Sequence, residues 1–127
     1  MACGASLRMW SSYLPESQIT AFDIRPECSS ICDDLNNVSI EICDISTYKN
    51  ESYVDMFDLI IDDASHIAEH IVDTFINTFR WVKPGGFYCI EDLSCTYNSL
   101  YTRQFRENFD PSVKNDRNHL LKLVNLL

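Results

Sequence analysis

Four short apolar runs, each ending in an acidic residue, constrain the fold of this 127-residue chain more than any other feature. They are residues 19–23 (ITAFD), 38–44 (VSIEICD), 57–63 (FDLIIDD) and 87–92 (FYCIED). The second alternates apolar and polar residues, which is typical of a half-exposed strand. The third and fourth hold continuous apolar cores, which indicates strands buried on both faces.

Helical patterns separate the four predicted strands. The longest covers residues 65–82 and begins at a plausible N-cap, Ser65. Its apolar positions recur at helical spacing: Ile67, Ile71, Phe75, Phe79 and Val82. It ends at KPGG, where Pro84 and Gly85 suit the second and third positions of a type II turn.

Residues 6–14 and 26–35 predict two further helices, and residues 112–127 predict a C-terminal one. Strands alternating with helices indicate the α/β class, with a mostly parallel sheet and helices on both faces. The length suits a single domain over residues 1–127, and 46% hydrophobic with 23% charged residues is ordinary for a globular protein.

Charge and composition exclude several classes of function. A net charge of −9 argues against a nucleic-acid partner, because phosphate binding depends on lysine and arginine. No run approaches the roughly 20 apolar residues that span a bilayer, and the N-terminus lacks a signal-peptide core. We therefore expect a cytoplasmic protein without a membrane partner, whose six cysteines are reduced.

Acidic residues gather where ligands bind in such sheets, beyond the carboxyl ends of the strands. Asp23 suits a ribose hydroxyl, although an Asp at this position is also a common turn residue. Asp63, Glu91 and Asp92 would follow neighbouring strands, and three carboxylates suit Mg²⁺ or a similar cation. His66, one helical turn beyond Asp63, could then accept a proton.

Two other interpretations of the same stretch stay open. In one, Asp62 caps the next helix and His66 only packs there. In the other, HIAEH at residues 66–70 is the H-x-x-E-H pattern of a zinc hydrolase, which requires His66 and His70 on one helix face and a further ligand from later in the chain.

Four stretches together resemble consecutive motifs of the class I S-adenosylmethionine-dependent methyltransferases. They are CGASLRMW, AFDIRPE, FDLIIDDASH and FRWVKPGGFYCIEDL, and they run in the family's order from Cys3 to about Tyr97. The resemblance is strongest to macrolide-sugar O-methyltransferases and cephalosporin-hydroxylase-like relatives. It implies a Rossmann-like three-layer fold.

The resemblance also implies roles for named residues. Those expected at the cofactor, S-adenosyl-L-methionine, are Gly4, Ala5 and Ser6 in a loop, Asp23 at the ribose, Asp44 near the adenine, and Asp62. Those expected at a divalent cation, Mg²⁺ or similar, are Asp63, Glu91 and Asp92, with His66 as general base. The implied reaction is metal-assisted methyl transfer to a hydroxyl of a small molecule, a sugar or polyol. A non-catalytic relative and an acid-rich phosphoryl-transfer domain are the alternatives.

Relatives of this type place a strand with a glycine-rich turn before the residues that match CGASLRMW, whereas only Met1 and Ala2 precede Cys3 here. We therefore expect a sheet without its first strand and its last strands, about four strands where the family has seven. Open sheet edges would favour a homo-oligomer or aggregation. We also expect weak or no S-adenosylmethionine binding by the isolated chain.

Overall fold

The computed structural model describes residues 4–113, 115, 120–121 and 123. Its contacts divide the chain into two compact units, Met1–Tyr48 and Lys49–Leu127, which are described separately below. The single domain over residues 1–127 stays a prediction. Most of the predicted C-terminal helix over residues 112–127 lies outside the described residues.

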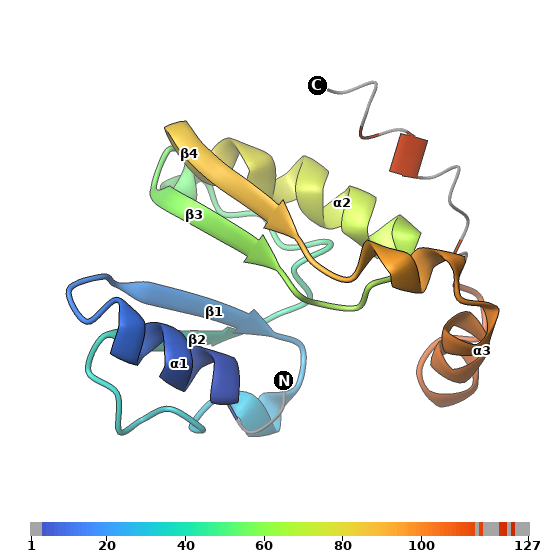
Figure 1. The fold of residues 1–127 in the computed structure, drawn as a ribbon, viewed down its shortest axis with the longest axis horizontal. Coiled ribbons are helices and arrows are strands. Elements are labelled where there is room, and N and C mark those ends of the chain that lie inside the picture. Colours follow the sequence, from blue (N-terminus) through green and yellow to red (C-terminus); the bar gives the residue numbers. More distant parts are fainter. Residues whose placement is uncertain (1–3, 114, 116–119, 122, 124–127) are drawn as a thin grey trace. The chain divides into compact units, whose positions relative to one another are not determined.

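The first unit is a two-stranded parallel sheet with one helix packed against it (Figure 1). Helix α1 (Ala5–Tyr13) runs antiparallel to β1 (Ile19–Asp23), so α1 begins at the carboxyl end of the strand. Strand β2 (Val38–Ile42) pairs with β1 along its whole length. Leu7, Ala21 and Cys32 form the buried core between them.

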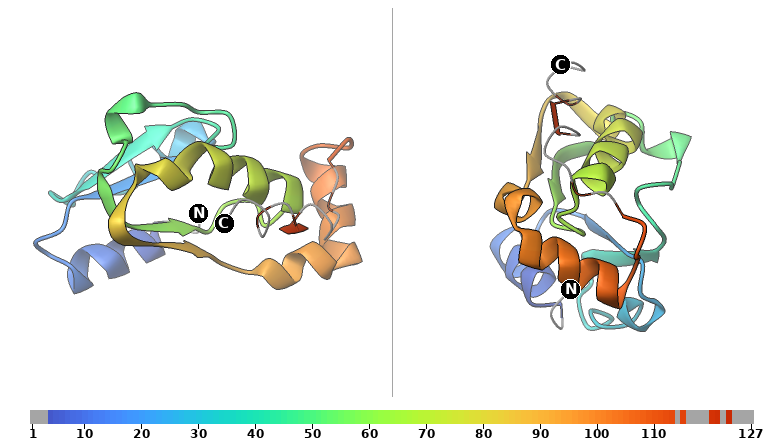
Figure 2. Two further views of the ribbon diagram at one scale, coloured as in Figure 1. Left: turned by 90° about the horizontal axis from the view of Figure 1, so that it is seen from above. Right: turned by 90° about the vertical axis from the view of Figure 1, so that its right-hand side faces the viewer.

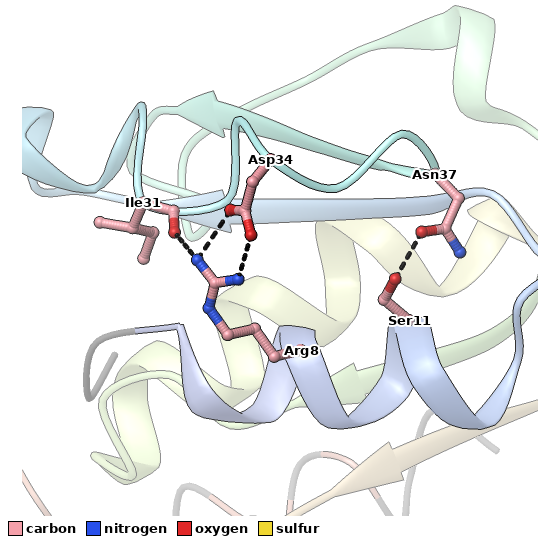
Figure 3. Close-up of polar contacts among 5 residues, drawn as sticks. All are labelled: Arg8, Ser11, Ile31, Asp34 and Asn37. Carbon is pink, nitrogen blue, oxygen red and sulfur yellow. Dashed lines mark hydrogen bonds and ion pairs between the residues drawn. The ribbon is translucent and has the colours of Figure 1, made fainter.

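Polar contacts fix α1 to the segment before β2 (Figure 3). The Arg8 guanidinium donates to both carboxylate oxygens of Asp34, at 2.6 and 2.8 Å, and to the backbone oxygen of Ile31 at 2.8 Å. One turn further along α1, the Ser11 hydroxyl donates to Asn37 Oδ1 at 2.6 Å. These contacts orient α1 on its sheet.

The helix predicted over residues 26–35 is wrong. A short 3-10 helix, η1 (Pro26–Cys28), is followed by successive turns. In an α-helix the Leu35 N–H would donate to the Ile31 carbonyl, but Arg8 occupies that oxygen and Leu35 N–H donates to Cys32 O at 2.9 Å instead.

The second unit is also a two-stranded parallel sheet covered by a helix. Strand β3 (Phe57–Asp62) pairs with β4 (Val82–Ile90), and helix α2 (Ala68–Thr78) connects them through the 3-10 helix η3 (Phe79–Trp81). The 3-10 helix η4 (Leu93–Tyr97) and helix α3 (Ser99–Asn108) follow β4, and η2 (Glu51–Tyr53) precedes β3.

The chain thus has the four predicted strands, parallel in pairs, and the α/β class is confirmed. The two sheets are separate, and no ladder joins β1 to β3 among the described residues.

Helix α2 buries the predicted apolar stripe only in part. Ile67, Ile71 and Phe75 are buried, whereas Phe79, the first residue of η3, is 45% exposed. The fourth strand was predicted to be buried on both faces, but Phe87 in it is 70% exposed. Within this unit, α2 covers one face alone (Figure 1).

The KPGG stretch lies inside β4 rather than before it. The pairing passes from Phe57 opposite Val82 directly to Leu59 opposite Phe87, so the intervening residues form a bulge. Gly85 has a φ of 86°, close to the value that the third position of a type II turn requires. Gly85 thus has the positive φ expected of it, but KPGG is part of strand β4 rather than a turn that ends the helix.

No helix in the described part of the chain combines the length and apolar character that crossing a membrane requires.

The two adjacent glycines of the bulge give a matched test of this geometry. A Cβ on Gly86 would lie 2.8 Å from the backbone oxygen of Asp58 and 2.7 Å from a methyl group of Val82, whereas a Cβ on Gly85 would meet no atom within 4 Å. Gly86→Ala should therefore lower the free energy of unfolding by about 1–3 kcal/mol. Gly85→Ala should lower it by only about 1 kcal/mol, the cost of a left-handed alanine. Urea denaturation of both variants measures the difference, and an equal or larger loss from Gly85→Ala would contradict this packing.

Candidate active site

Three predicted cofactor residues lie at the start of α1 in the first unit. Gly4 is the N-cap with a φ of 68°, and Ala5 and Ser6 form the first turn. A Cβ on Gly4 would lie 2.9 Å from the Cys32 sulfur, so glycine allows the chain to pass close to this neighbour. The free N–H groups of the first turn then lie at the carboxyl end of β1, where they could donate to a polar ligand.

Asp23 is the last residue of β1, and its carboxylate is hydrogen-bonded to Arg25, two residues later. Its carboxylate accepts hydrogen bonds from the backbone N–H of Arg25 at 2.9 Å and from Arg25 Nε at 3.3 Å. Partial burial would raise the pKa of Asp23, but these bonds and one from the Cys28 thiol outweigh it and hold the pKa below its usual value. Asp23 is therefore a charged acceptor at neutral pH, and its contact with Arg25 is that of a turn residue. Its ribose role stays a prediction.

Asp44 lies just beyond β2, is exposed and also forms a local turn. Its Oδ1 accepts hydrogen bonds from the Ser46 N–H at 3.0 Å and from the Ser46 hydroxyl at 2.6 Å. The other carboxylate oxygen has no role in this turn. The predicted contact with the adenine is thus neither supported nor opposed by the geometry.

In the second unit, three predicted site residues meet at the carboxyl edge of the sheet. His66 Nε2 lies 3.6 Å from Asp63 Oδ1 and 3.9 Å from Asp92 Oδ2. One ligating atom from each of the three residues lies within 4.8 Å of the others. We call Asp63, His66 and Asp92 the acid–histidine cluster.

The three side chains of the acid–histidine cluster differ in their exposure to solvent. The side chains of Asp63 and Asp92 are 55% and 66% exposed, whereas that of His66 is 15% exposed. Two solvent-facing carboxylates and an imidazole nitrogen are donors that a divalent cation accepts in proteins. The exposed side of the carboxylates leaves room for water or a substrate oxygen, so the donor set fits such an ion.

Glu91, the third predicted metal ligand, lies outside the acid–histidine cluster. It is exposed, and its backbone N–H donates to the backbone oxygen of Asp62 at 3.0 Å. The structure thus groups His66, rather than Glu91, with Asp63 and Asp92. Whether Glu91 turns toward a cation when one binds stays a prediction.

His66 is not helical, contrary to the expectation that it lies one helical turn beyond Asp63. Residues 63–67 form a loop, and His66 has a φ of 54°. A left-handed conformation at a residue other than glycine costs on the order of 1–3 kcal/mol and persists only when the surroundings enforce it. Asp92, with a φ of 51°, is strained in the same way. Two of the three cluster residues therefore have strained backbones.

Helix α2 begins at Ala68, three residues later than predicted, and Ser65 is not its N-cap. The Ser65 hydroxyl instead accepts from the Ile67 N–H at 3.3 Å and forms a hydrogen bond with His70 Nδ1 at 3.0 Å. The first N–H of the helix, on Ala68, donates to Asn115 Oδ1 at 2.9 Å. The cap thus comes from a side chain 47 positions later.

Two residues near the site were missed by the sequence analysis. Asn115 caps α2, and Tyr101 of α3 donates from its hydroxyl to the backbone oxygen of Ser65 at 2.7 Å. Figures 1 and 2 show η4 and α3 beside the first turn of α2, at the carboxyl end of the sheet. No local pattern marks either residue, because both contacts join segments far apart in the sequence.

The zinc-hydrolase interpretation requires His66 and His70 on one helix face, and the structure does not meet that requirement. His66 precedes the helix, and His70 Nδ1 is bonded to Ser65. Within the described ranges, no cluster of potential metal ligands includes both histidines.

Asp62, the last residue of β3, is buried and only partly satisfied. Its Oδ1 accepts from the Ala64 N–H at 3.3 Å, so it caps a turn rather than the next helix. Its Oδ2 is buried with no hydrogen-bond partner among the described residues. Burial raises the pKa of Asp62. Because buried polar atoms are normally paired, the free oxygen fits a site where a ligand supplies the missing donor.

The chain is similar to curated sugar O-methyltransferases. The mycinamicin VI 2''-O-methyltransferase of Micromonospora griseorubida is 37% identical over 101 residues, which cover 74% of this chain and 24% of that protein. A tetracenomycin-C 3'-O-methyltransferase of Streptomyces olivaceus, acting on an 8-demethyl-8-(2-methoxy-alpha-L-rhamnosyl) substrate, is 36% identical over 95 residues, with 74% and 24% covered. The chain therefore spans about a quarter of the length of these relatives. No family model matches the chain.

The chain is also similar in structure to solved methyltransferases. One is the MycE methyltransferase of the mycinamycin biosynthetic pathway in complex with Mg, SAH and mycinamycin VI. The match covers 96% of this chain and 33% of the MycE chain, with a TM-score of 0.66 and 32% sequence identity. Another crystal form, with Mg and SAH, matches 77% of this chain and 25% of its own with a TM-score of 0.63 and 35% identity.

Removing the buried charge of Asp62 should stabilise the protein. Because its pKa is higher in the folded state than in the unfolded state, its ionisation opposes folding, and stability falls as the pH rises through the interval between the two values. Asp62→Asn should raise the free energy of unfolding at pH 7 by on the order of 1 kcal/mol, since an amide does not ionise. This gain should disappear below about pH 4, the ordinary pKa of aspartate.

Denaturation at pH 7 and pH 4 measures the effect, with Asp73→Asn on the exposed face of α2 as the control. A variant at Asp62 that is less stable than the parent at pH 7 would show that the carboxylate contributes more through its bond to Ala64 than it costs by burial.

Proposed function

Because this chain belongs to the class I S-adenosylmethionine-dependent methyltransferases, we propose that it serves metal-assisted transfer of a methyl group from S-adenosylmethionine to a hydroxyl of a small molecule, a sugar or polyol. The observation that supports this most is the acid–histidine cluster, in which an imidazole nitrogen lies within 4 Å of two carboxylates at the carboxyl edge of a parallel sheet. The relatives are named as methyltransferases of sugar hydroxyls on larger molecules, and we extend that substrate class to this chain.

Asp63 and Asp92 would hold the divalent cation, with Glu91 as the third ligand expected from the family. A cation held there supplies a Lewis acid that lowers the pKa of an adjacent hydroxyl. Among the described residues, the two carboxylates form ion pairs with His66 and with no lysine or arginine. Their mutual repulsion would therefore be relieved by a bound cation.

His66 would be the general base. Its side chain is 15% exposed, and Nε2 lies 3.6 Å from Asp63 Oδ1 and 3.9 Å from Asp92 Oδ2. A hydroxyl bound at the proposed cation would therefore lie near this proton-accepting atom. Nε2 takes the hydroxyl proton as the oxygen bonds to the methyl carbon and the carbon–sulfur bond breaks, leaving S-adenosylhomocysteine.

Residues of the first unit would bind the methyl donor. Gly4, Ala5 and Ser6 offer backbone N–H groups at the start of α1, and Asp23 offers a charged acceptor beyond β1. The backbone N–H groups suit a carboxylate of the methyl donor, and the Asp23 carboxylate suits its hydroxyl groups. That Asp62 also binds the methyl donor stays a prediction.

The cation site can be tested directly. Asp63→Asn and Asp92→Asn should each weaken the binding of Mn²⁺, used as a probe for Mg²⁺, while the fold is retained because both side chains are exposed. Calorimetric titration measures the affinity, and Glu91→Gln in the same series shows whether Glu91 is a ligand. Mn²⁺ affinity that stays the same in both Asp variants would remove the metal site from this proposal.

The general base can be tested by turnover. In any preparation of the chain that transfers methyl groups, His66→Ala should lower turnover by roughly 10²- to 10⁴-fold, the usual contribution of general base catalysis. Binding of S-adenosylmethionine should not change, and His70→Ala should have a much smaller effect. Equal losses from the two variants, together with dependence on zinc, would instead favour the H-x-x-E-H interpretation.

A further inference from the structure

We propose that Tyr101 of α3 is a positioning residue, whose hydroxyl holds the peptide bond that enters His66 and so keeps the imidazole between Asp63 and Asp92. The geometric part stands on the structure alone. Its consequence for catalysis rests on the proposed function, in which His66 is the base.

The contact acts on the backbone of His66 itself. The Tyr101 hydroxyl donates to the Ser65 carbonyl oxygen at 2.7 Å, and that carbonyl belongs to the same peptide unit as the His66 N–H. The next peptide unit is held as well, because the Ile67 N–H donates to the Ser65 hydroxyl at 3.3 Å. Both peptide planes that flank His66 therefore have a fixed orientation.

Such restraint is needed because His66 has a left-handed backbone, with a φ of 54°. A histidine released from its neighbours would return to an ordinary conformation, and its ring would then leave the two carboxylates. The Ser65 hydroxyl is a local partner, whereas Tyr101 is 36 residues away. Tyr101 thus ties the strained loop to a separate helix, which a turn within the loop cannot do.

Tyr101 is suited to this task and not to proton transfer. Burial raises the pKa of its hydroxyl, and Cys95 and Asp92 raise it further, so the hydroxyl keeps its proton and remains a donor. That proton is committed to the Ser65 carbonyl. The Tyr101 ring lies beside the His66 ring, with 6.3 Å between the centroids, and limits the space into which the imidazole could turn.

Helix α3 is itself fixed, so Tyr101 has a stable base. Asn98 caps the helix by accepting from the N–H groups of Leu100 and Tyr101, at 3.0 and 3.1 Å. Asn115 then joins α3 to α2: its Nδ2 donates to Thr102 Oγ1 at 2.6 Å, and its Oδ1 accepts from the first N–H of α2. Figure 2 shows α3 beside the beginning of α2 in both views.

Tyr101→Phe in the full chain without metal tests the geometric claim, because it keeps the ring and removes only the hydroxyl. The measurement is the NMR signal of the His66 imidazole, assigned by its loss in His66→Ala. The parent should give one sharp signal, and Tyr101→Phe should shift it and broaden or split it as the loop samples other conformations. Tyr97→Phe is the matched control, since Tyr97 is 65% exposed in the adjoining η4 and should leave the signal unchanged.

Mn²⁺ titration of the same variants separates the two hypotheses. Tyr101→Phe should leave Mn²⁺ affinity unchanged, because the proposed ligands are Asp63, Glu91 and Asp92, and the Tyr101 hydroxyl contacts the backbone beside His66. A His66 signal identical to that of the parent overturns the positioning role, even if the variant melts at a lower temperature. An altered His66 signal in a chain whose parent binds no Mn²⁺ supports the positioning role and overturns the metal site instead.

Discussion

Parallel pairing of β3 with β4 is the constraint on which the candidate site depends. The register places Asp62 opposite Ile90, so the residues that follow both strands emerge at one edge. Neighbouring strands are about 4.8 Å apart, and this spacing brings Asp63 and Asp92 near a common point although they are distant in the sequence. The same pairing gathers negative charge at that edge, where Asp62 is also buried. The acidic residues that would serve the proposed function at this edge therefore also lower the stability of the fold.

Much of the backbone could be predicted from the sequence because apolar periodicity and acidic strand ends are local signals. The first three strands begin where the apolar runs predicted them, whereas β4 begins at Val82, before its predicted run over residues 87–92. Helix α1 matches its predicted segment within one residue at each end. The errors arose where a side chain from another element competed with the local pattern. The helix predicted after Pro26 is replaced by turns, in which the Ile31 carbonyl accepts from Arg8 and the Leu35 N–H donates to Cys32 O. Helix α2 begins late because Ser65 is bonded to His70 and Asn115 supplies the cap.

The candidate site likewise has features that could be predicted from the sequence and features that depend on tertiary packing. Asp63 and Asp92 could be placed together because they follow neighbouring strands, and both lie within ion-pairing range of His66. The same reasoning grouped Glu91 with them, whereas the structure leaves Glu91 outside the cluster. The left-handed backbone of His66 and its contact with Tyr101 could not be predicted, because they depend on where α3 packs. Sequence reasoning thus identified which side chains are present at the edge. How they are oriented required the packing of the whole unit.

The remote cap on α2 also has a consequence for how this unit opens. A helix that ends in a local N-cap loses its first hydrogen bonds by fraying alone, whereas here the Ala68 amide is protected by a residue 47 positions away. Hydrogen exchange at that amide therefore requires the release of the Asn115 side chain as well as fraying of the first turn. One hydrogen bond thus closes a loop of 47 positions. It ties the edge that carries the acid–histidine cluster to a part of the chain that lies beyond β4, η4 and α3.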